Sequence, residues 1–518
     1  MAAVDELAGP PLADEAGLGA LTVGGLLQES TARHRHRQAM TFEGRAWTYD
    51  DLERDVRVLA RALLAAGTQR GTRVAVVMGN RPEWIEAAFA VASIGGVLVP
   101  VNTFYEPPEL EYVLGHSDAE VVLVQPEIAH RPIAEIVDTL AGDLPLGPRV
   151  ACLDTPSWDA LLAGADDVTD AQFDALASQI SPQDDAVIVY TSGTTARPKG
   201  VLHAHQPPAL QSWRFAQQLR LHPDVRAWSA FPFFWTAGFC MVMGATLAAG
   251  GCLVLQDYFD PGQALLLLEA ERVTTPHAWP HQLAAMEDHP DWATRDLSSV
   301  RHVEAFTSFG RHPTVHIEDV WSPRAAYGLT ETFTIISSLP CDTPPEERIG
   351  SGLVLPGNVV RIVDGEICVK GATLMKGYYK VAAEDCFDTD GFFHTGDAGE
   401  LDDAGYLYWT GRVTDLIKTG GANVSPVEIE EALVRHPGLK AALAVGVAHP
   451  TLGEEVVVCA VAHEGSDVDE ADVRAFLRGR IASYKIPRRV VFVDDADLDF
   501  TGNAKIRTEK LRALAAEP

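Results

Sequence analysis

The segment YTSGTTARPKGV, residues 190–201, concentrates groups that can hold an anion. Glycines let backbone N–H groups converge on one point, the Ser and Thr hydroxyls add donors, and Arg197 and Lys199 add positive charge. The apolar run DAVIVY (185–190) precedes the segment and predicts a buried strand leading into a loop. A Walker A loop is excluded, because that motif needs Gly-Lys followed by Ser or Thr, and here Pro198 precedes the lysine. The composition therefore predicts a different phosphate-binding loop, with a polar surface turn as the alternative.

The whole string resembles the signature loop of the adenylate-forming superfamily, which includes acyl-CoA synthetases, luciferases and the adenylation domains of peptide synthetases. The usual pattern is (Y/F)TSGTTGxPKG, and Ala196 replaces one of its glycines. If that position needs a positive φ, alanine costs roughly 1 kcal/mol there and the loop is expected to close differently. Further motifs of the superfamily follow in the expected order: YGLTET (327–332), GEICVKGATLMKGYY (365–379), HTGD (394–397), GRVTDLIKTGGANVSPVEIEEAL (411–433) and TGNAKIRTEKL (501–511).

The resemblance covers nearly the whole chain and implies a two-step reaction that uses ATP and Mg²⁺. A carboxylate attacks the α-phosphate and gives an acyl-AMP and pyrophosphate. The thiol of coenzyme A, or of the phosphopantetheine arm of a carrier protein, then displaces AMP. Because the first step brings two anions together, neutralisation of charge and positioning are expected to dominate catalysis.

The resemblance assigns the phosphate-binding residues. The donors to the β- and γ-phosphates are expected to be Thr191, Ser192, Gly193, Thr194 and Thr195, with Lys199 assisting. Glu331 is expected to bind Mg²⁺, because a hard cation prefers carboxylate and phosphate oxygens. Thr330 is expected to bond the α-phosphate. Glu331 and Thr191 are also expected to take part in catalysis.

The resemblance also assigns the rest of the nucleotide site. Tyr327, with Gly328 beside it, is expected near the adenine, and Asp397 and Arg412 are expected at the ribose hydroxyls. Lys505 is the expected catalytic lysine. A cation between the attacking carboxylate and the α-phosphate stabilises the transition state more than the ground state.

Two half-reactions need two geometries, and the superfamily obtains them by rotating a small C-terminal domain. The expected domains are residues 1–411, which bind AMP and the acyl group, and residues 412–518, which form a mobile lid. Thr414 is the expected hinge, although β-branching restricts its backbone. After rotation, Gly420 and Gly421 are expected to approach the thiol.

The segment FPFFWTAGF (231–239) bears on the acid. Many acyl-CoA ligases have PxFHxxG here, and Trp235 stands in place of the histidine. Trp235 cannot pair with an α-amine, which argues against α-amino acids, and it is expected to be an apolar wall or gate, with an ordinary core position as the alternative. The candidate pocket residues are Trp235, Thr236, Gly238, Phe239, Phe306, Thr307, Gly310, Gly328, Thr332 and Phe333. They favour an aryl or a medium- to long-chain acid. His281 is expected to be structural rather than part of the pocket.

The elements that must position these residues can be read from the apolar pattern. Leu52, Val56, Leu59 and Leu63 form one helical stripe. Short apolar runs at 73–79, 96–102, 120–126, 185–190 and 252–256 predict strands. They lack alternation and are separated by helices, which favours parallel strands covered on both faces. A helix at 426–435, strands near 440–447 and 455–463, a helix at 470–482 and a strand near 489–494 predict a small α+β unit. The fold class is therefore α/β, with a large layered N-terminal domain and a small mobile α+β C-terminal domain.

Composition narrows the partners. The formal net charge of −31 disfavours nucleic acid and anionic membranes. The seven cysteines are scattered without a CxxC pair, which indicates reduced thiols in a cytoplasmic protein and no zinc framework. No signal peptide and no apolar run long enough to span a bilayer occur in the sequence. The resemblance is compatible with a homodimer.

An acid–CoA ligase is the leading hypothesis, and three alternatives stay open. The chain could load a carrier-protein thiol. It could activate nitrite with ATP, as diazotising members of the superfamily do. It could also be a nucleotide-binding relative without activity, although Lys505, Glu331 and Asp397 are all present. Basic residues near the thiol channel would favour free coenzyme A, because of its 3′-phosphate.

Overall fold

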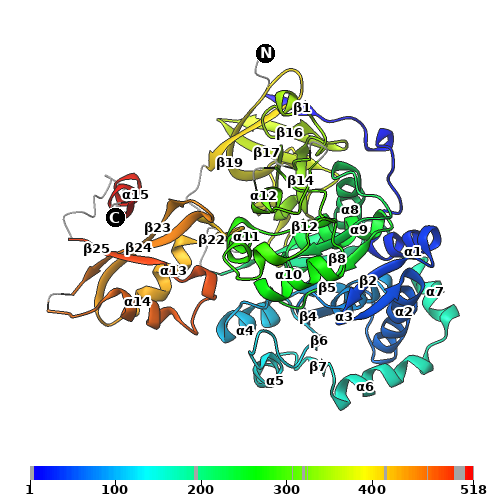
Figure 1. The fold of residues 1–518 in the computed structure, drawn as a ribbon. Coiled ribbons are helices and arrows are strands. Elements are labelled where there is room, and N and C mark those ends of the chain that lie inside the picture. The colour runs from blue at the N-terminus through cyan, green and yellow to red at the C-terminus, as the bar shows by residue number, and fades with distance from the viewer. Residues whose placement is uncertain are drawn as a thin grey trace.

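The computed structural model describes residues 5–191, 197–305, 307–317, 321–323, 325–412, 417–463, 465–494 and 508–516. It shows a mixed α/β protein with a large N-terminal domain and a smaller C-terminal domain (Figure 1). Within these ranges, no helix has both the length and the apolar character that crossing a bilayer requires.

A seven-stranded sheet lies at the centre of the large domain. Its strand order is β18 (Gly377–Tyr378), β9 (Lys199–Ala204), β8 (Asp185–Thr191), β5 (Val97–Pro100), β4 (Arg73–Val77), β6 (Val121–Val124) and β7 (Arg149–Cys152). The five strands from β8 to β7 run parallel, whereas β9 and β18 are antiparallel additions at one edge. Four of the predicted apolar runs are β4, β5, β6 and β8, so these predictions are confirmed.

Helices cover both faces of this sheet, as the unbroken apolar runs predicted. Val74 and Val76 of β4 belong to one core, with helices α2 (Tyr49–Ala65) and α3 (Pro82–Ser93). Ala75 and Val77 belong to the opposite core, with α4 (Pro107–His116) and α5 (Ile133–Asp143). The remaining helices of this region are α1 (Val23–His34), α6 (Pro156–Ala163) and α7 (Asp170–Ala177).

A second, five-stranded sheet carries the segment that contains Trp235. Its order is β12 (Thr275–His277), β10 (Arg226–Ser229), β11 (Cys252–Val254), β2 (Gln38–Phe42) and β3 (Arg45–Thr48). The elements around it are α8 (Gln206–Gln218), the π-helix η3 (Ala237–Gly244), α9 (Ala245–Ala248), α10 (Pro261–Ala270), α11 (Pro280–Glu287) and α12 (Ser308–Arg311). The predicted run 252–256 is β11, which belongs to this sheet and not to the first one.

Two antiparallel sheets, built mainly from residues 326–412, were not predicted from the sequence. One contains β13 (Ala326–Leu329), β14 (Thr334–Ser338) and β15 (Leu353–Val354). The other contains β1 (Glu6–Ala8), β16 (Asn358–Val363), β17 (Glu366–Gly371), β19 (Phe393–Leu401) and β20 (Leu407–Arg412). They carry three of the sequence motifs, so the motif positions depend on pairings between distant segments.

The C-terminal domain is a five-stranded sheet with helices. The strands are β21 (Ile417–Thr419), β22 (Ala422–Val424), β23 (Leu439–His449), β24 (Gly453–Ala462) and β25 (Arg489–Phe492). The helices are α13 (Pro426–Leu433), α14 (Glu470–Leu477) and α15 (Thr508–Ala516). The helix predicted for 470–482 ends earlier than expected, because Arg478 is extended and Gly479 follows with φ of 73°. The domain boundary predicted after residue 411 falls at the end of β20 and stays a prediction.

Candidate active site and its two cavities

The hairpin of β8 and β9 holds both ends of the predicted phosphate loop. Thr191 and Lys199 are register partners across the two strands. The loop residues between them, Ser192, Gly193, Thr194, Thr195 and Ala196, lie outside the described residues. The hairpin nevertheless fixes where the loop begins and ends, at the edge of the parallel sheet.

Tyr378 brings Glu331 and Lys199 together. It lies in β18 and pairs with Val201 of β9, so the segment 365–379 is tied to the strand that follows the loop. Its hydroxyl donates to Glu331 Oε1 at 2.7 Å, and the ammonium of Lys199 lies 4.8 Å from the centre of its ring. One carboxylate beside a phosphate loop fits a hard cation that takes its other oxygen ligands from phosphates and water.

A buried histidine joins the loop strand to the YGLTET segment. His203 of β9 donates through Nε2 to the backbone carbonyl of Thr330 at 2.8 Å. Burial lowers the pKa of His203 to about 4, so the ring is neutral at pH 7. Its other contact is the ring of Phe333, at 5.0 Å between centres. This bond holds Thr330 beside the strand that ends the phosphate loop.

Tyr327 and Asp397 face each other from two different sheets. The hydroxyl of Tyr327 donates to Asp397 Oδ2 at 2.7 Å, and both residues are buried. Asp397 of β19 is the register partner of Arg412 in β20. The structure thus brings together the three residues that the sequence assigned to adenine and ribose. In this arrangement the hydroxyl of Tyr327 points at the carboxylate of Asp397.

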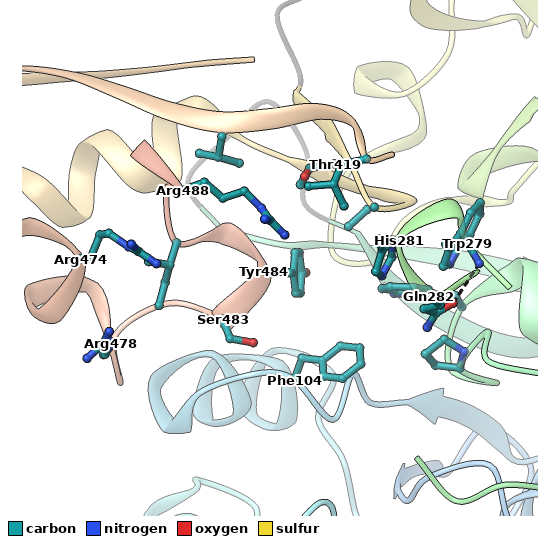
Figure 2. A pocket seen from close by; sticks show the side chains of 17 residues that line it. Phe104, Trp279, His281, Gln282, Thr419, Arg474, Arg478, Ser483, Tyr484 and Arg488 are labelled. Carbon is teal, nitrogen blue, oxygen red and sulfur yellow. Dashed lines mark hydrogen bonds between the residues drawn. The ribbon is translucent and has the colours of Figure 1, made fainter. Parts of the chain in front are cut away.

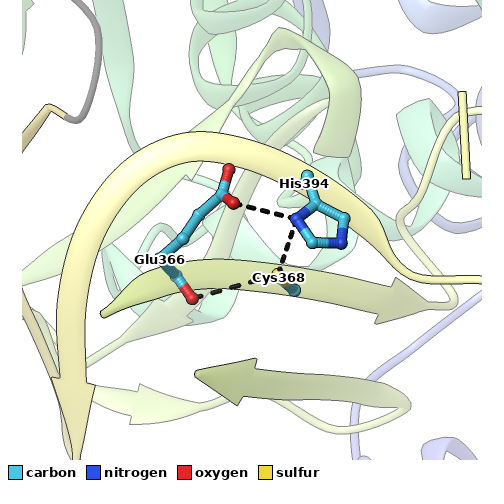
Figure 3. Close-up of side chains that lie close together, drawn as sticks. All are labelled: Glu366, Cys368 and His394. Carbon is cyan, nitrogen blue, oxygen red and sulfur yellow. Dashed lines mark hydrogen bonds and ion pairs between the residues drawn. The ribbon is translucent and has the colours of Figure 1, made fainter. Parts of the chain in front are cut away.

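A hydrogen-bonded cluster supports the strand that carries Asp397 (Figure 3). Glu366 Oε1 accepts the backbone N–H of Gly396 at 2.8 Å, and its Oε2 lies 2.8 Å from Nδ1 of His394. The Cys368 sulfur lies 3.4 Å from the same nitrogen. Burial raises the pKa of Cys368 to about 12, which keeps it a thiol. The cluster therefore fixes the backbone immediately before Asp397.

A cavity of about 300 Å³ opens beside the YGLTET segment, and we call it the α8 cavity. Its wall includes Tyr327, Gly328 and Thr330, and also Thr236, which the sequence proposed as a pocket residue. Sequence reasoning missed most of its apolar lining, which comes from Phe215, Leu219, Met241, Ile335 and Leu339. Phe215, Gln218 and Leu219 have i, i+3, i+4 spacing and form one stripe at the end of α8, which was the available signal.

Other proposed pocket residues lie elsewhere. Phe239 and Phe333 are buried in the core and pack against each other at 5.5 Å between ring centres. Thr332 is also buried, and its hydroxyl donates to the carbonyls of Leu329 and Thr334. Neither aromatic ring lines the α8 cavity.

Of the remaining proposed pocket residues, the two glycines allow close backbone contacts and the threonine caps a helix. A Cβ on Gly238 would lie 2.0 Å from the carbonyl oxygen of Pro232, and one on Gly310 would lie 2.4 Å from that of Glu304. Thr307 caps helix α12, and Phe306 lies outside the described residues.

A second cavity, of about 480 Å³, lies between the two domains and is called the interdomain cavity (Figure 2). Trp235 lines this cavity and not the α8 cavity. Aromatic side chains of Phe104 and Tyr484 face it, and its C-terminal wall carries three guanidinium groups, from Arg474, Arg478 and Arg488. Such a wall suits a ligand with several negative charges and an aromatic group.

The glycine pair of the hinge-proximal motif reaches this cavity. Gly420 lines it, with φ of 56°, and a Cβ there would lie 3.3 Å from His281 Nδ1. Gly421 has φ of 83°, and a Cβ would lie 2.4 Å from the Trp279 ring. His281, expected to be structural, lines the same cavity. Burial and Arg488 lower its pKa, so it is neutral at pH 7.

The expected hinge and the expected catalytic lysine are also not described. Lys505 and Thr414 lie outside the described residues, and their roles stay predictions.

The chain matches two family models and is similar to known proteins over nearly its whole length. Residues 27–379 match the family model "AMP-binding enzyme", and residues 428–505 match "AMP-binding enzyme C-terminal domain". A feruloyl-CoA synthase of Amycolatopsis sp is 34% identical, over 92% of this chain and 96% of that protein. An indoleacetate–CoA ligase of Aromatoleum aromaticum is 33% identical, over 93% of this chain and 95% of that protein. The amide bond synthetase McbA of Marinactinospora thermotolerans has a similar structure, with a TM-score of 0.74 and 25% identity, covering 95% of this chain and 99% of that chain.

Proposed function

Because the chain belongs to the AMP-binding enzyme family, we propose that it is an AMP-forming acid–CoA ligase that activates an apolar carboxylic acid as its acyl-AMP. The observation that carries this proposal is the convergence of Lys199, Tyr378 and Glu331 beside the loop strand. Tyr327, which donates to Asp397 of β19, lies on the same YGLTET segment as Glu331.

In the first step, a carboxylate oxygen of the acid attacks the α-phosphorus of ATP. A phosphorus–oxygen bond forms, the bond to the β-phosphate breaks, and pyrophosphate leaves. Lys199 and the Thr191 end of the loop would hold the β- and γ-phosphates, and Thr330 would hold the α-phosphate. Bound Mg²⁺, held by Glu331, would supply positive charge to the phosphates. Lys505 would place a cation between the two reacting anions.

In the second step, the thiol sulfur attacks the acyl carbon. A carbon–sulfur bond forms, the carbon–oxygen bond to AMP breaks, and the thiol proton is released. The interdomain cavity supports free coenzyme A as the acceptor, because Arg474, Arg478 and Arg488 can bind its phosphates. The sequence alone named no basic residues for this role. The phosphopantetheine arm of a carrier protein has a single phosphate, so it would bind fewer of these three guanidinium groups than coenzyme A would.

The α8 cavity supports an acid of moderate size. An engineered cavity of about 150 Å³ holds one benzene, so about 300 Å³ suits a bicyclic or substituted aryl acid or a medium-length chain. The amide oxygen of Gln218, on the cavity wall, is buried without a hydrogen-bond partner. A buried acceptor without a partner is costly, and a hydroxyl or N–H on the acid would satisfy it. This favours an aryl acid with such a group over a plain fatty acid. The two CoA ligases compared above are named for aryl acids.

The proposal is tested by incubating the protein with MgATP and a panel of hydroxyaryl, indolyl, unsubstituted aryl and fatty acids. The acceptor in separate reactions is coenzyme A, a phosphopantetheinylated carrier protein or an amine. A further reaction replaces the acid by nitrite and supplies an arylamine. Acid-dependent release of pyrophosphate and a coenzyme A thioester, identified by mass, are expected. Transfer only to the carrier protein, only to the amine, or only with nitrite would replace coenzyme A by that acceptor. No pyrophosphate with any acid or with nitrite would overturn ligase activity.

A further inference from the structure

One lysine is completely buried at the contact between the two domains. The ammonium of Lys485 donates to Glu109 Oε1 and to Glu428 Oε1, each at 2.7 Å. The side chain of Lys485 is 0% exposed, and those of Glu109 and Glu428 are 7% and 8% exposed. A charged group with so little access to water depends on its partners for its stability.

The three residues come from both sides of the interface. Lys485 ends a short 3-10 turn (Ser483–Lys485), and Glu428 lies in the first turn of α13, so both belong to the C-terminal domain. Glu109 lies in the first turn of α4, in the large domain. Its Oε2 accepts the backbone N–H of Glu106 at 3.0 Å, which holds the carboxylate in place with Oε1 directed at Lys485. Glu109 is therefore a fixed acceptor that the large domain presents to the C-terminal domain.

The triad lies directly behind the wall of the interdomain cavity. Tyr484, next to Lys485, lines that cavity and meets Phe104 of the large domain edge to face at 6.2 Å. The hydroxyl of Tyr484 accepts a bond from Asn102 Nδ2 at 3.4 Å. The ammonium of Lys485 also lies 5.4 Å from the Tyr105 ring. The contact that buries the triad thus continues, through Tyr484 and Phe104, into the wall of the interdomain cavity.

We propose that Glu109 is a positioning residue for the transfer of the acyl group: by binding Lys485, it holds the C-terminal domain in the orientation that assembles the interdomain cavity. This inference rests on the proposed function and on the expected rotation of the C-terminal domain, which would give adenylation and transfer two orientations. In the other orientation Lys485 keeps Glu428, which is in its own domain, and loses Glu109. The Lys485–Glu109 bond therefore favours one of the two orientations.

The balance of charges in the Lys485–Glu109–Glu428 triad should let the C-terminal domain dock and also leave again. Two carboxylates share one ammonium, and burial together with the neighbouring Glu109 raises the pKa of Glu428. Docking therefore places a second negative charge beside a pair that is already neutral. The second carboxylate therefore stabilises the docked orientation less than an isolated ion pair would, which suits a domain that must leave again after each turnover.

The test uses the full-length protein with Glu109→Gln, which keeps the shape of the side chain and removes its charge. Glu111→Gln is the matched control, because Glu111 is an exposed glutamate on the same helix, α4. Two rates are measured: acid-dependent exchange of pyrophosphate into ATP, and single-turnover transfer from the acyl-AMP to coenzyme A. Losing one partner of a buried charge pair should slow transfer in Glu109→Gln at least about tenfold, with exchange within about twofold of wild type and both rates unchanged in Glu111→Gln.

A second readout does not depend on activity. Spin labels at Leu146→Cys and Val434→Cys, both exposed positions, report the distance between the domains, and the native cysteines are buried. The short-distance population should fall in Glu109→Gln and stay in Glu111→Gln. An unchanged population, or equal losses in exchange and transfer, would overturn the inference. A shifted distance population in a protein that releases no pyrophosphate would support the role of Glu109 in docking and would reject the proposed function.

Discussion

At the scale of single residues, Tyr378 connects two groups that a motif comparison treats separately. Glu331 and Lys199 are far apart in the sequence, and both contact the same tyrosine. The hydroxyl of Tyr378 holds the carboxylate of Glu331 in a position where it can bind a cation. The ring of Tyr378 holds the ammonium of Lys199 near the phosphate loop. The tyrosine should therefore matter for adenylation by positioning these two groups.

Replacing Tyr378 by Phe tests this arrangement. The ring that Lys199 contacts stays, and the hydrogen bond to Glu331 is lost. We expect acyl-AMP formation to slow about tenfold and the Mg²⁺ concentration for half-maximal rate to rise, because a bond to a charged group is lost. Pyrophosphate exchange measured across a Mg²⁺ titration checks this. Wild-type exchange at every Mg²⁺ concentration would show that Tyr378 does not position Glu331.

Gln218 offers a test of the acid. In Gln218→Leu the unpartnered amide is replaced by an apolar group of similar size. The ratio of kcat/KM for a hydroxyaryl acid to that for the same acid without its hydroxyl should fall about tenfold, because a bond to the substrate is lost. Steady-state kinetics with the matched pair of acids measures the ratio. If the ratio stays constant, Gln218 does not form a hydrogen bond with the hydroxyl of the acid.

Residue types in motifs could be assigned from the sequence, whereas cavity residues could not. Asp397, Tyr327 and Glu331 stand in strings whose spacing is diagnostic, and the structure pairs Tyr327 with Asp397 and Glu331 with Tyr378. Phe239 and Phe333 were proposed as pocket residues because they are aromatic and close to such strings. They pack inward, since the side on which a side chain lies depends on the π-helix and on the positive φ of Phe333.

At the scale of elements, the turn between β21 and β22 is tightly constrained where it meets the large domain. Both of its glycines have positive φ, and Gly421 lies against the indole of Trp279 with no room for a methyl group. This turn can approach the large domain only because it has no side chains.

Gly421→Ala should therefore impair docking. The new Cβ would lie 2.4 Å from the Trp279 ring at a φ that alanine disfavours. We expect transfer to coenzyme A to fall at least about tenfold with pyrophosphate exchange retained, because only the docked orientation meets the clash. Gly465→Ala, at a turn with a similar φ and nothing within 4 Å of the added Cβ, is the control for backbone strain. Equal effects of the two substitutions would assign the loss to strain alone.

The strands of the parallel sheet could be predicted because each is a short apolar run buried on both faces. The antiparallel sheets of residues 326–412 could not, because their pairings join distant segments such as β1 and β16. Local sequence carries the tendency to form a strand and not the identity of its partner. For the same reason the sequence named Trp235 and Gly420 without showing that they share one cavity.

At the scale of the whole molecule, buried neutral histidines link stability to pH. Burial lowers the pKa of His203, His205 and His277 to about 4. A histidine whose folded pKa is lowered contributes stability that is present above its unfolded pKa and is lost as the pH falls toward its folded pKa. The window is therefore from about pH 6.5 down to about pH 4.

His277→Gln isolates one such contribution. Wild type should lose roughly 3 kcal/mol more than the variant in the free energy of unfolding between pH 7 and pH 4, because a shift of one pKa unit corresponds to about 1.4 kcal/mol. Urea unfolding of both proteins, followed across this range by tryptophan fluorescence, gives the difference. Parallel curves would mean that His277 is not a buried neutral group.

The most direct test of the central claim follows the oxygen atoms of the acid. An acid accepted by the enzyme is labelled with ¹⁸O in both carboxylate oxygens and incubated with MgATP and coenzyme A, and the AMP is analysed by mass. If the carboxylate attacks the α-phosphate, AMP carries one ¹⁸O for each thioester formed. Unlabelled AMP alongside thioester, or label in ADP or inorganic phosphate, would contradict activation through an acyl-AMP.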